Sequence, residues 1–148
     1  MGLFDAIDIS GSGLSAERLR MDVTAENLAN AQTTRGANGK PYQRKDVILE
    51  EIPQSGFGAQ LSSAMGTGTG AGAGGVQVAG IVADPTPDRM VYDPGHPDAN
   101  AQGYVQMPNV NPVTEMVDLI TASRSYEANV TAMQTAKQMF SKTLDLLK

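Results

Sequence analysis

The sequence predicts a mainly α-helical chain with a small β-rich insert, in which long N- and C-terminal helices pair as a coiled-coil-like hairpin. Apolar residues recur at seven-residue spacing near both ends of the 148-residue chain, as they do where one helix packs along another. Seven of the eight prolines lie from position 41 to position 108, which excludes a long helix from the centre. We therefore expect an N-terminal helical segment over residues 1–34, a central β-rich insert over 35–110, and a C-terminal helical segment over 111–148 that packs with the first.

The N-terminal segment carries apolar residues on two sides of a helix. The main stripe, at seven-residue spacing, consists of Ile7, Leu14, Met21 and Leu28. A rotation of about 100° per residue places a second stripe on the opposite side, consisting of Ile9, Ala16 and Val23. Gly11 and Gly13 each cost about 1 kcal/mol relative to alanine in a helix interior. We therefore expect the part before Leu14 to be bent or separately ordered.

The insert contains two segments that favour strands and one that is rich in glycine. YQRKDVILEE, at 42–51, and VQVAGIV, at 76–82, have the β-branched content that is typical of strands. Between them, residues 56–75 contain eight glycines in twenty positions and almost no bulky side chain. This composition predicts a flexible loop.

The C-terminal segment has the signals of a helix start, followed by long apolar rows. We expect Asn111 to cap the helix, with Pro112 at its first position and Glu115 near the positive end of its dipole. Two rows at seven-residue spacing follow, one of Leu119, Tyr126, Met133, Phe140 and Leu147, the other of Met116, Ser123, Val130, Lys137 and Leu144. A further stripe near the opposite face consists of Val117, Ala128, Met139 and Leu146. A helix that is buried on one side only does not need this stripe, so we expect contacts outside the hairpin.

Composition and charge exclude several classes of function. The net charge is −5 and the eleven lysines and arginines are distributed along the chain, whereas a nucleic-acid or anionic-membrane surface needs clustered positive charge. The absence of cysteine excludes disulfides and thiolate metal sites. No apolar run approaches the roughly 20 residues that span a bilayer, and Asp5 and Asp8 lie where a secretory signal has its basic and apolar regions. We expect a soluble chain without a cleaved signal peptide, without nucleic-acid binding and without direct membrane insertion.

The residues that could carry chemistry do not form a recognisable site. The glycine-rich run lacks the Lys-Ser or Lys-Thr of a phosphate-binding loop and precedes a strand-like segment. Ser12 lacks the flanking glycines of a nucleophile elbow, and His96 is the single histidine, placed among turn residues. Four aspartates match no calcium-loop spacing and are expected to be solvated turn residues: Asp84, Asp88, Asp93 and Asp98. We therefore expect no catalytic residues, no metal or other cofactor, and no small-molecule substrate.

Both ends of the chain resemble one protein family. SGLSAERLRMDVTAENLANAQTT, at 12–34, and MPNVNPVTEM with ASRSYEANV, within 107–130, are similar to the terminal regions of the bacterial flagellar rod, hook and filament proteins. DPGHPDANAQGYV, at 93–105, resembles the segment that leads into the C-terminal region. The C-terminal motif and the short length of the chain resemble those of a proximal rod protein, whereas distal-rod and hook members are longer. The chain departs from the family pattern at two places. It has Gly13 where these relatives usually have alanine, and it has a long glycine-rich loop.

The resemblance implies a structural subunit of the proximal rod of the flagellar basal body, a periplasmic drive shaft that transmits torque from the membrane motor to the hook. It also implies export by the flagellar type III apparatus without a cleaved signal, with the chain itself and homologous rod proteins as partners. In that family the paired terminal helices form the inner layer of a helical tube, and the insert lies outside. Helices that are apolar on two sides fit this arrangement, because heterologous contacts repeated by a non-closing rotation build an open helical stack.

We expect the residues that hold the helix pair and contact neighbouring subunits to come from both ends of the chain. Asn27 and Asn30, in TAENLANAQTT, are expected to satisfy terminal carbonyls and to fix one register, as a buried asparagine does in a coiled coil. The full expected set is Leu14, Met21, Val23, Asn27, Leu28, Asn30, Met116, Val117, Leu119, Tyr126, Val130, Met133, Met139, Phe140 and Leu144.

Two other interpretations stay open at this point. A soluble helical adaptor or export chaperone would bind partner helices in apolar grooves while staying monomeric or forming a closed dimer. A secreted enzyme would need a folded pocket with a perturbed acid. Open-ended assembly with homologous rod subunits separates the structural interpretation from both.

Overall fold

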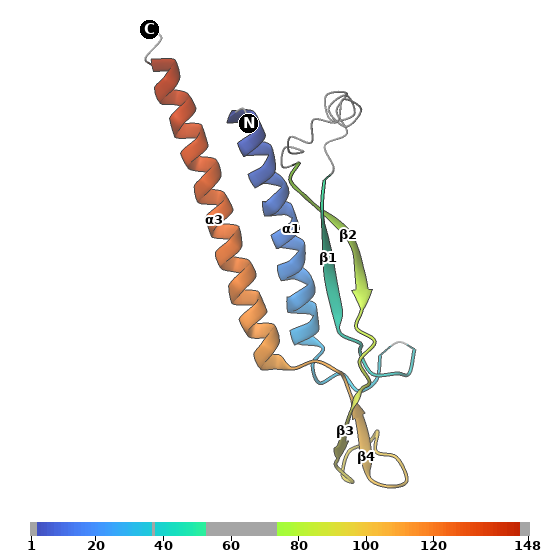
Figure 1. The fold of residues 1–148 in the computed structure, drawn as a ribbon. Helices are drawn as coiled ribbons and strands as arrows, with labels where there is room; N and C mark the ends of the chain where they lie inside the picture. The colour runs from blue at the N-terminus through green and yellow to red at the C-terminus, as the bar shows by residue number, and fades with distance from the viewer. Residues whose placement is uncertain (1–2, 37, 53–73, 146–148) are drawn as a thin grey trace, which may run out of the picture. The chain divides into compact units, whose positions relative to one another are not determined.

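The computed structural model describes residues 3–36, 38–52 and 74–145 (Figure 1). The elements follow in the order α1 (Leu3–Ala29), β1 (Lys45–Glu51), β2 (Val76–Ala83), β3 (Arg89–Tyr92), β4 (Tyr104–Met107) and α3 (Pro112–Asp145). The two long terminal helices pack together, and the small central β region consists of two hairpins. The expected fold class is confirmed. The glycine-rich loop expected at 56–75 lies outside the described residues, apart from Gly74 and Gly75.

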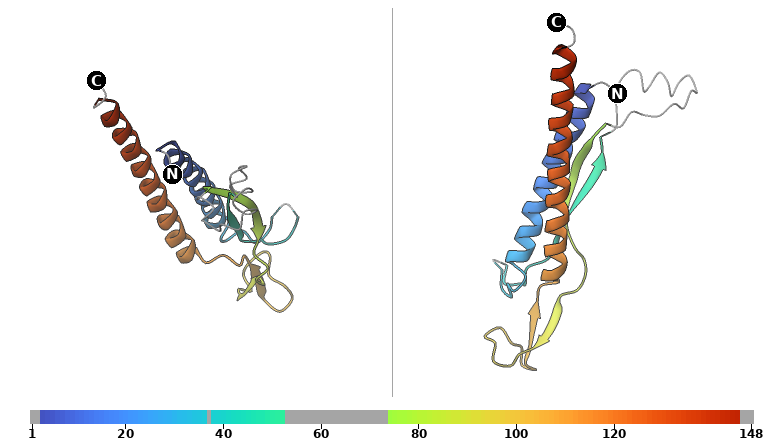
Figure 2. Two further views of the ribbon diagram at one scale, coloured as in Figure 1. Left: turned by 45° about the horizontal axis from the view of Figure 1, so that its top comes forward. Right: turned by 90° about the vertical axis from the view of Figure 1, so that its left-hand side faces the viewer.

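The chain forms two compact units, and both terminal helices contribute to each. One unit comprises the described residues within 1–18, 49–79 and 124–148, and the other comprises those within 19–48 and 80–123. In the first unit Gly13 of α1 lies against Asn129 of α3, and in the second Asn27 bonds to Glu115. Later residues of α1 therefore meet earlier residues of α3, so the two helices are antiparallel (Figure 2).

α1 is one continuous helix through Gly11 and Gly13, so the part before Leu14 is not a separate helix. Helix packing in the first unit explains why glycine is suitable there. A Cβ at Gly13 would lie 3.0 Å from Asn129 Nδ2, and one at Gly11 would lie 3.9 Å from Met133 Cε. At Gly13 the missing side chain lets α1 and α3 approach closely, which offsets the low helix propensity of glycine, whereas a Cβ at Gly11 would make ordinary van der Waals contact.

The second stripe of α1 is better buried than its main stripe at two of its three positions, Ile9 being half-buried. Ala16 and Val23 are 2% and 5% exposed. The main stripe is half-buried, at Ile7, Leu14, Met21 and Leu28. Strands of the same chain form hydrogen bonds beside the second stripe. In the first unit β2 bonds to Ser12, which lies one turn before Ala16. In the second unit β1 bonds to Asn27, which lies one turn after Val23. Strands of the same chain therefore already cover this face of α1.

The strands expected at 42–51 and 76–82 are present as β1 and β2, and Gly75 closes one end of their hairpin. Gly75 O accepts from Ile52 N at 3.0 Å, and the next backbone N–H, that of Val76, donates to Ser12 Oγ at 3.1 Å. The φ angle of Gly75 is +89°, and a Cβ there would lie 2.7 Å from Ser12 Oγ. The position therefore needs glycine for both its backbone conformation and its contact with α1.

The second hairpin, β3–β4, is antiparallel and was not singled out in the sequence. Val91 lies opposite Val105, and Tyr92 lies opposite Tyr104. The two tyrosine rings meet edge to face, with centroids 5.3 Å apart and planes at 66°. Val105 is buried whereas both tyrosines are exposed, so the hairpin has one packed face and one face open to solvent.

Replacing Gly75 by alanine is expected to lower the free energy of unfolding by about 1–3 kcal/mol, because a side chain is strained at this φ and displaces the Ser12 hydroxyl. Urea unfolding of the purified chain, followed by circular dichroism, measures the loss. Gly80→Ala in β2 is the control, since its Cβ would meet open space, and it is expected to change the free energy by less than about 0.5 kcal/mol. Equal stability of Gly75→Ala and the unchanged chain would contradict this role for Gly75.

Candidate functional site

Asn27, near the C-terminal end of α1, is 1% exposed and uses all of its hydrogen-bonding capacity. Its amide nitrogen donates to Lys45 O at 2.8 Å and to Glu115 Oε2 at 3.0 Å. Its amide oxygen accepts from Lys45 N and from the Tyr42 hydroxyl, both at 2.9 Å. An amide side chain has two donor hydrogens and two acceptor lone pairs, so every bonding position of Asn27 is filled.

The pairing of Asn27 with Lys45 imitates a neighbouring β-strand. In an antiparallel ladder, a residue exchanges both of its backbone hydrogen bonds with the residue opposite. The Asn27 amide makes the same two bonds with the N–H and C=O of Lys45, the first residue of β1. A side chain of α1 therefore closes the edge of β1 at this residue and determines where the strand meets the helix.

Glu115 places a buried carboxylate at the start of α3. It is 1% exposed and accepts from Arg44 Nε at 2.6 Å, in addition to its bond with Asn27. The helix start has the expected cap, because Asn111 Oδ1 accepts from Val113 N at 3.1 Å and Asn111 O accepts from Glu115 N at 3.0 Å. The helix dipole further stabilises a carboxylate in this first turn.

The guanidinium of Arg44 lies among several carboxylates. Besides Glu115, it has Asp46 at 3.6 Å and both Asp84 and Asp118 at 3.7 Å. The hydrogen bond with Glu115 raises the pKa of Arg44, and the nearby negative charges add to this rise against the opposing effect of burial. Arg44 therefore stays a fixed positive charge that holds the first residues of β1 against α3.

Asn109, just before α3, joins the backbone of Arg44 to the segment between β2 and β3. Its Oδ1 accepts from Arg44 N at 2.8 Å, and its Nδ2 donates to Thr86 O at 3.1 Å. We refer to six residues as the polar joint: Asn27, Tyr42, Arg44, Lys45, Asn109 and Glu115. The polar joint connects the end of α1, the start of β1, the segment between β2 and β3, and the start of α3.

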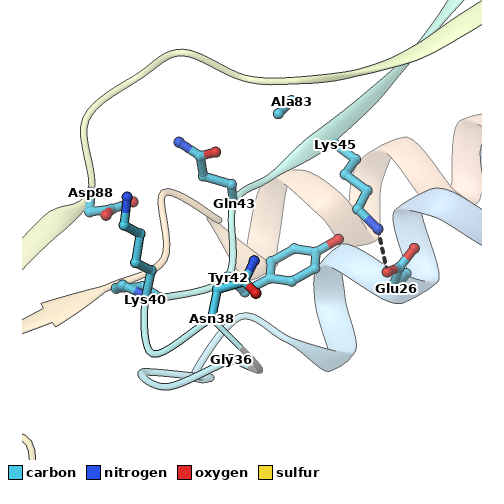
Figure 3. Close-up of a pocket in the computed structure, with 10 residues that line it drawn as sticks. Glu26, Gly36, Asn38, Lys40, Tyr42, Gln43, Lys45, Ala83 and Asp88 are labelled. Carbon is cyan, nitrogen blue, oxygen red and sulfur yellow. Dashed lines mark hydrogen bonds and ion pairs between the residues drawn. The ribbon is translucent and has the colours of Figure 1, made fainter.

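An open groove of about 610 Å³ lies beside the polar joint, and its lining includes Lys40, Tyr42 and Lys45 (Figure 3). Lys45 Nζ bonds to Glu26 Oε1 at 2.6 Å and lies 5.6 Å from the centroid of the Tyr42 ring. Burial, together with the negative charges of Glu26 and Glu115, raises the pKa of Tyr42 to about 12. Tyr42 therefore stays a neutral hydrogen-bond donor to Asn27 at pH values where an exposed tyrosine has lost its proton.

The residues that were considered for chemistry serve in turns and hydrogen bonds. The hydroxyl and backbone N–H of Thr86 both donate to Asp84, and these bonds lower the pKa of Asp84. Asp98 accepts from Thr34 Oγ1 at 2.8 Å, and its backbone N–H donates to His96 Nδ1 at 3.1 Å. Across residues 3–36, 38–52 and 74–145, no group of three or more histidine, aspartate or glutamate side chains is placed to hold a metal ion. Neither helix, over its described residues, is long and apolar enough to cross a membrane.

Comparisons with known proteins match both ends of the chain to flagellar rod families. Residues 7–37 match the family described as flagella basal body rod protein, and residues 101–146 match the C-terminal family of flagellar basal body rod FlgEFG proteins. The chain is 49% identical to the basal-body rod protein FlgC of Bacillus subtilis over 100% of both chains. It is 45% identical to FlgC of Yersinia enterocolitica over 99% of this chain and 98% of the relative. It is 42% identical to FlgC of Borreliella burgdorferi over 100% of this chain and 99% of the relative. The chain belongs to the FlgC family of flagellar basal-body rod proteins.

The FlgC family is structural and non-enzymatic, and this member is a structural protein of the flagellar basal-body rod. The resemblance seen in the terminal motifs is thereby confirmed. The polar joint draws on both matched regions, since Asn27 lies in the first and Asn109 and Glu115 lie in the second. The remaining joint residues, within 42–45, lie between the two matches.

The residues expected at helix contacts and subunit interfaces differ widely in exposure. Val23 and Asn27 are buried. Half-buried positions are Leu14, Met21, Leu28, Asn30, Leu119, Tyr126, Val130 and Met133, and exposed positions are Met116, Val117, Met139, Phe140 and Leu144. Met116 and Leu144, which were expected to hold the helix pair, are each 48% exposed. The assignment of this set to subunit contacts stays a prediction.

The two asparagines of TAENLANAQTT have different roles. Asn30 Nδ2 donates to Glu26 O at 2.9 Å, so it satisfies a carbonyl near the end of α1 as expected. Asn27 bonds instead to a strand and to the second helix, so the expectation that it satisfies terminal carbonyls is wrong. The reason is that the backbone of Lys45 in β1 needs hydrogen-bond partners beside α1, where no neighbouring strand supplies them.

Four residues of the polar joint were not singled out from the sequence: Tyr42, Arg44, Lys45 and Asn109. Arg44 does carry a signal, because a charged side chain in a strand that packs against other elements needs a partner of opposite charge. Its partner Glu115 lies 71 positions away and had been interpreted only through the helix dipole. Ser12 had been considered only as a nucleophile, whereas its hydroxyl accepts from Val76 N.

Replacing Asn27 by aspartate is expected to lower the free energy of unfolding by about 3–5 kcal/mol. The change keeps the size of the side chain but removes both donors and places a second carboxylate beside Glu115. Chemical denaturation of the purified chain measures the loss. Glu26→Gln is the control, because this substitution is also isosteric and Glu26 also bonds to Lys45. The Glu26–Lys45 ion pair is exposed, however, and contributes less than about 1 kcal/mol to the free energy of unfolding. Similar losses for the two variants would show that the buried amide has no special role.

The raised pKa of Tyr42 predicts a loss of stability at high pH. An unfolded tyrosine releases its proton near pH 10, whereas folded Tyr42 keeps it until about pH 12, so the folded state binds more protons between these values. The free energy of unfolding should therefore fall as the pH rises through this interval. Tyr42→Phe should be less stable near pH 8 and should lack this part of the fall. Denaturation of both proteins in steps up to about pH 12 is the measurement, and parallel pH profiles would count against the assignment.

Proposed function

We propose that this chain is a subunit of the proximal rod and assembles helically, through its terminal helices, with itself and with homologous rod proteins. The rod so formed passes torque from the motor to the hook. Membership of the FlgC family supports the proposal, because the FlgC relatives match this chain over nearly its whole length. Two long terminal helices, which the rod family uses for assembly, support it as well.

The observation that carries the proposal is an exposed apolar stripe at the start of α3. Its members lie at positions i, i+3, i+4 and i+7, share one helical face and are 48–68% exposed: Val113, Met116, Val117 and Ile120. The opposite face of the same turns is buried, at Glu115 and Ala122. Within one chain the stripe faces solvent, and contiguous apolar surface of this kind marks a site of protein–protein contact.

An open assembly needs a contact that uses different surfaces on the two partners. If a different surface of the neighbouring subunit covers the stripe, the contact is heterologous, and its repetition by a non-closing rotation makes a helical stack. α3 has 34 residues and a length of about 51 Å, so each subunit offers an extended surface to its neighbours. A long shaft under torque benefits from contacts spread over such a length.

We further propose that the chain works in the periplasm and is exported by the flagellar type III apparatus without a cleaved signal. Its FlgC-family membership supports this. A soluble adaptor or export chaperone could use the same apolar stripe to bind partner helices. Such a protein would not remain in purified basal bodies, so their composition separates the two functions.

Replacing Val117 by glutamate is expected to reduce the amount of the chain in purified basal bodies at least about tenfold, because the contact would have to bury a charge. Swimming should be lost as well. Thr131→Glu is the control: Thr131 is exposed, lies within about 40° of the same helical face, and has polar surroundings. It should incorporate and swim normally. Circular dichroism checks that both variants fold, and normal incorporation of Val117→Glu would contradict the proposal.

A further inference from the structure

We infer that the polar joint is the place where force passes between the helices and the β hairpins, with Asn27 and Glu115 as its positioning residues. The inference rests on the proposed function, because it assumes a subunit that transmits torque. It concerns a single compact unit, which contains the whole joint, the adjoining parts of α1 and α3, and the β3–β4 hairpin.

Three backbone connections converge on the joint, and each is held there by hydrogen bonds. The connection from α1 to β1 ends at Lys45, which Asn27 holds by two bonds. The connection from β2 to β3 begins at Asp84, whose N–H donates to Arg44 O at 2.8 Å. The connection from β4 to α3 includes Asn109, which accepts from Arg44 N. A connection without such bonds has two soft dihedrals per residue and resists bending poorly.

The bonds of the joint are suited to resist deformation. The contact between Arg44 and Glu115 is 2.6 Å long and charge-assisted, which makes it stronger than a bond between neutral groups. Asn27 and Glu115 are both 1% exposed, so water does not reach them to replace a strained bond. Separating these elements would leave a buried carboxylate and a buried amide unpaired, and both states are costly.

Stability alone is a weak reason to keep such a group. A buried ion pair often stabilises a protein no more than apolar side chains of similar volume, because two charges must be removed from water. Hydrogen bonds differ from apolar contacts in direction, since they weaken steeply when the donor angle departs from linear. The joint therefore defines one orientation of α1, β1 and α3, which apolar contacts between small side chains do not.

The test uses motile cells in which the only copy of the chain carries one substitution. Glu115→Gln keeps the size of the side chain and one acceptor oxygen, for Arg44, but removes the charge and places an NH2 group where Asn27 Nδ2 needs an acceptor. Asn27→Asp removes both amide donors. Glu26→Gln, at an exposed residue that also bonds to Lys45, is the matched control. Two quantities are measured: the amount of the chain in purified basal bodies, and the fraction of flagella that still rotate after swimming at low and at high viscosity.

We expect Glu115→Gln to incorporate within about twofold of the unchanged chain and to lose rotation at high viscosity at least about fivefold more often, with no difference at low viscosity. Glu26→Gln should match the unchanged chain in both measurements. Rods of Glu115→Gln that assemble and withstand high viscosity normally would overturn the inference. Failure of both joint variants to incorporate would also overturn it, since the joint would then serve folding alone. Absence of the unchanged chain from basal bodies would instead refute the proposed function.

Discussion

The buried amide of Asn27 joins α1 to β1 and α3 at a place where few apolar side chains are available to do so. The chain has only 5% aromatic residues, and among its described residues the buried apolar side chains are those of alanine, valine and Pro108. Small side chains allow close approach of helices and strands but impose little direction on it. The hydrogen bonds of Asn27 therefore supply the orientation that a larger interlocking core supplies in other proteins, and Glu115 and Arg44 extend this orientation to the start of α3.

Local sequence signals were sufficient for the helices and for the longer strands. The seven-residue spacing and the Asn111 cap depend only on neighbouring residues, so α1 and α3 could be predicted without knowledge of their partners. β3 and β4 have only four residues each, and a period-two pattern is hard to recognise over that length. Gly13 was misjudged because helix propensity counts its cost within α1 and not the close approach to Asn129 that it permits.

The polar joint could not be predicted from local sequence patterns. Asn27 could be singled out because asparagine has a cost in a helix, but its partners Lys45 and Glu115 are 18 and 88 positions away. No periodicity connects residues at such separations, and each partner taken alone has an ordinary explanation as a strand residue or a helix-start acid. The second stripe of α1 shows the same limit. Its apolar character was recognised, but the sequence alone does not distinguish a strand of the same chain from a neighbouring subunit as its cover.

The first turns of α3 combine the two surfaces on which the proposed mechanism depends. Glu115 lies on the inner side, in the polar joint, whereas Val113 and Val117 are exposed on the opposite side. A contact at the exposed stripe and the bonds of the joint therefore act on the same few residues. Because a helical turn is stiff, a force applied at one face of these turns reaches the other. Met139, about 40° from Val117 around the helix, is also exposed, but of these apolar residues only those from Val113 to Ile120 lie on the turns that carry the joint. In a rod subunit, this arrangement places the surface that would receive force from a neighbour directly behind the bonds that would pass it on.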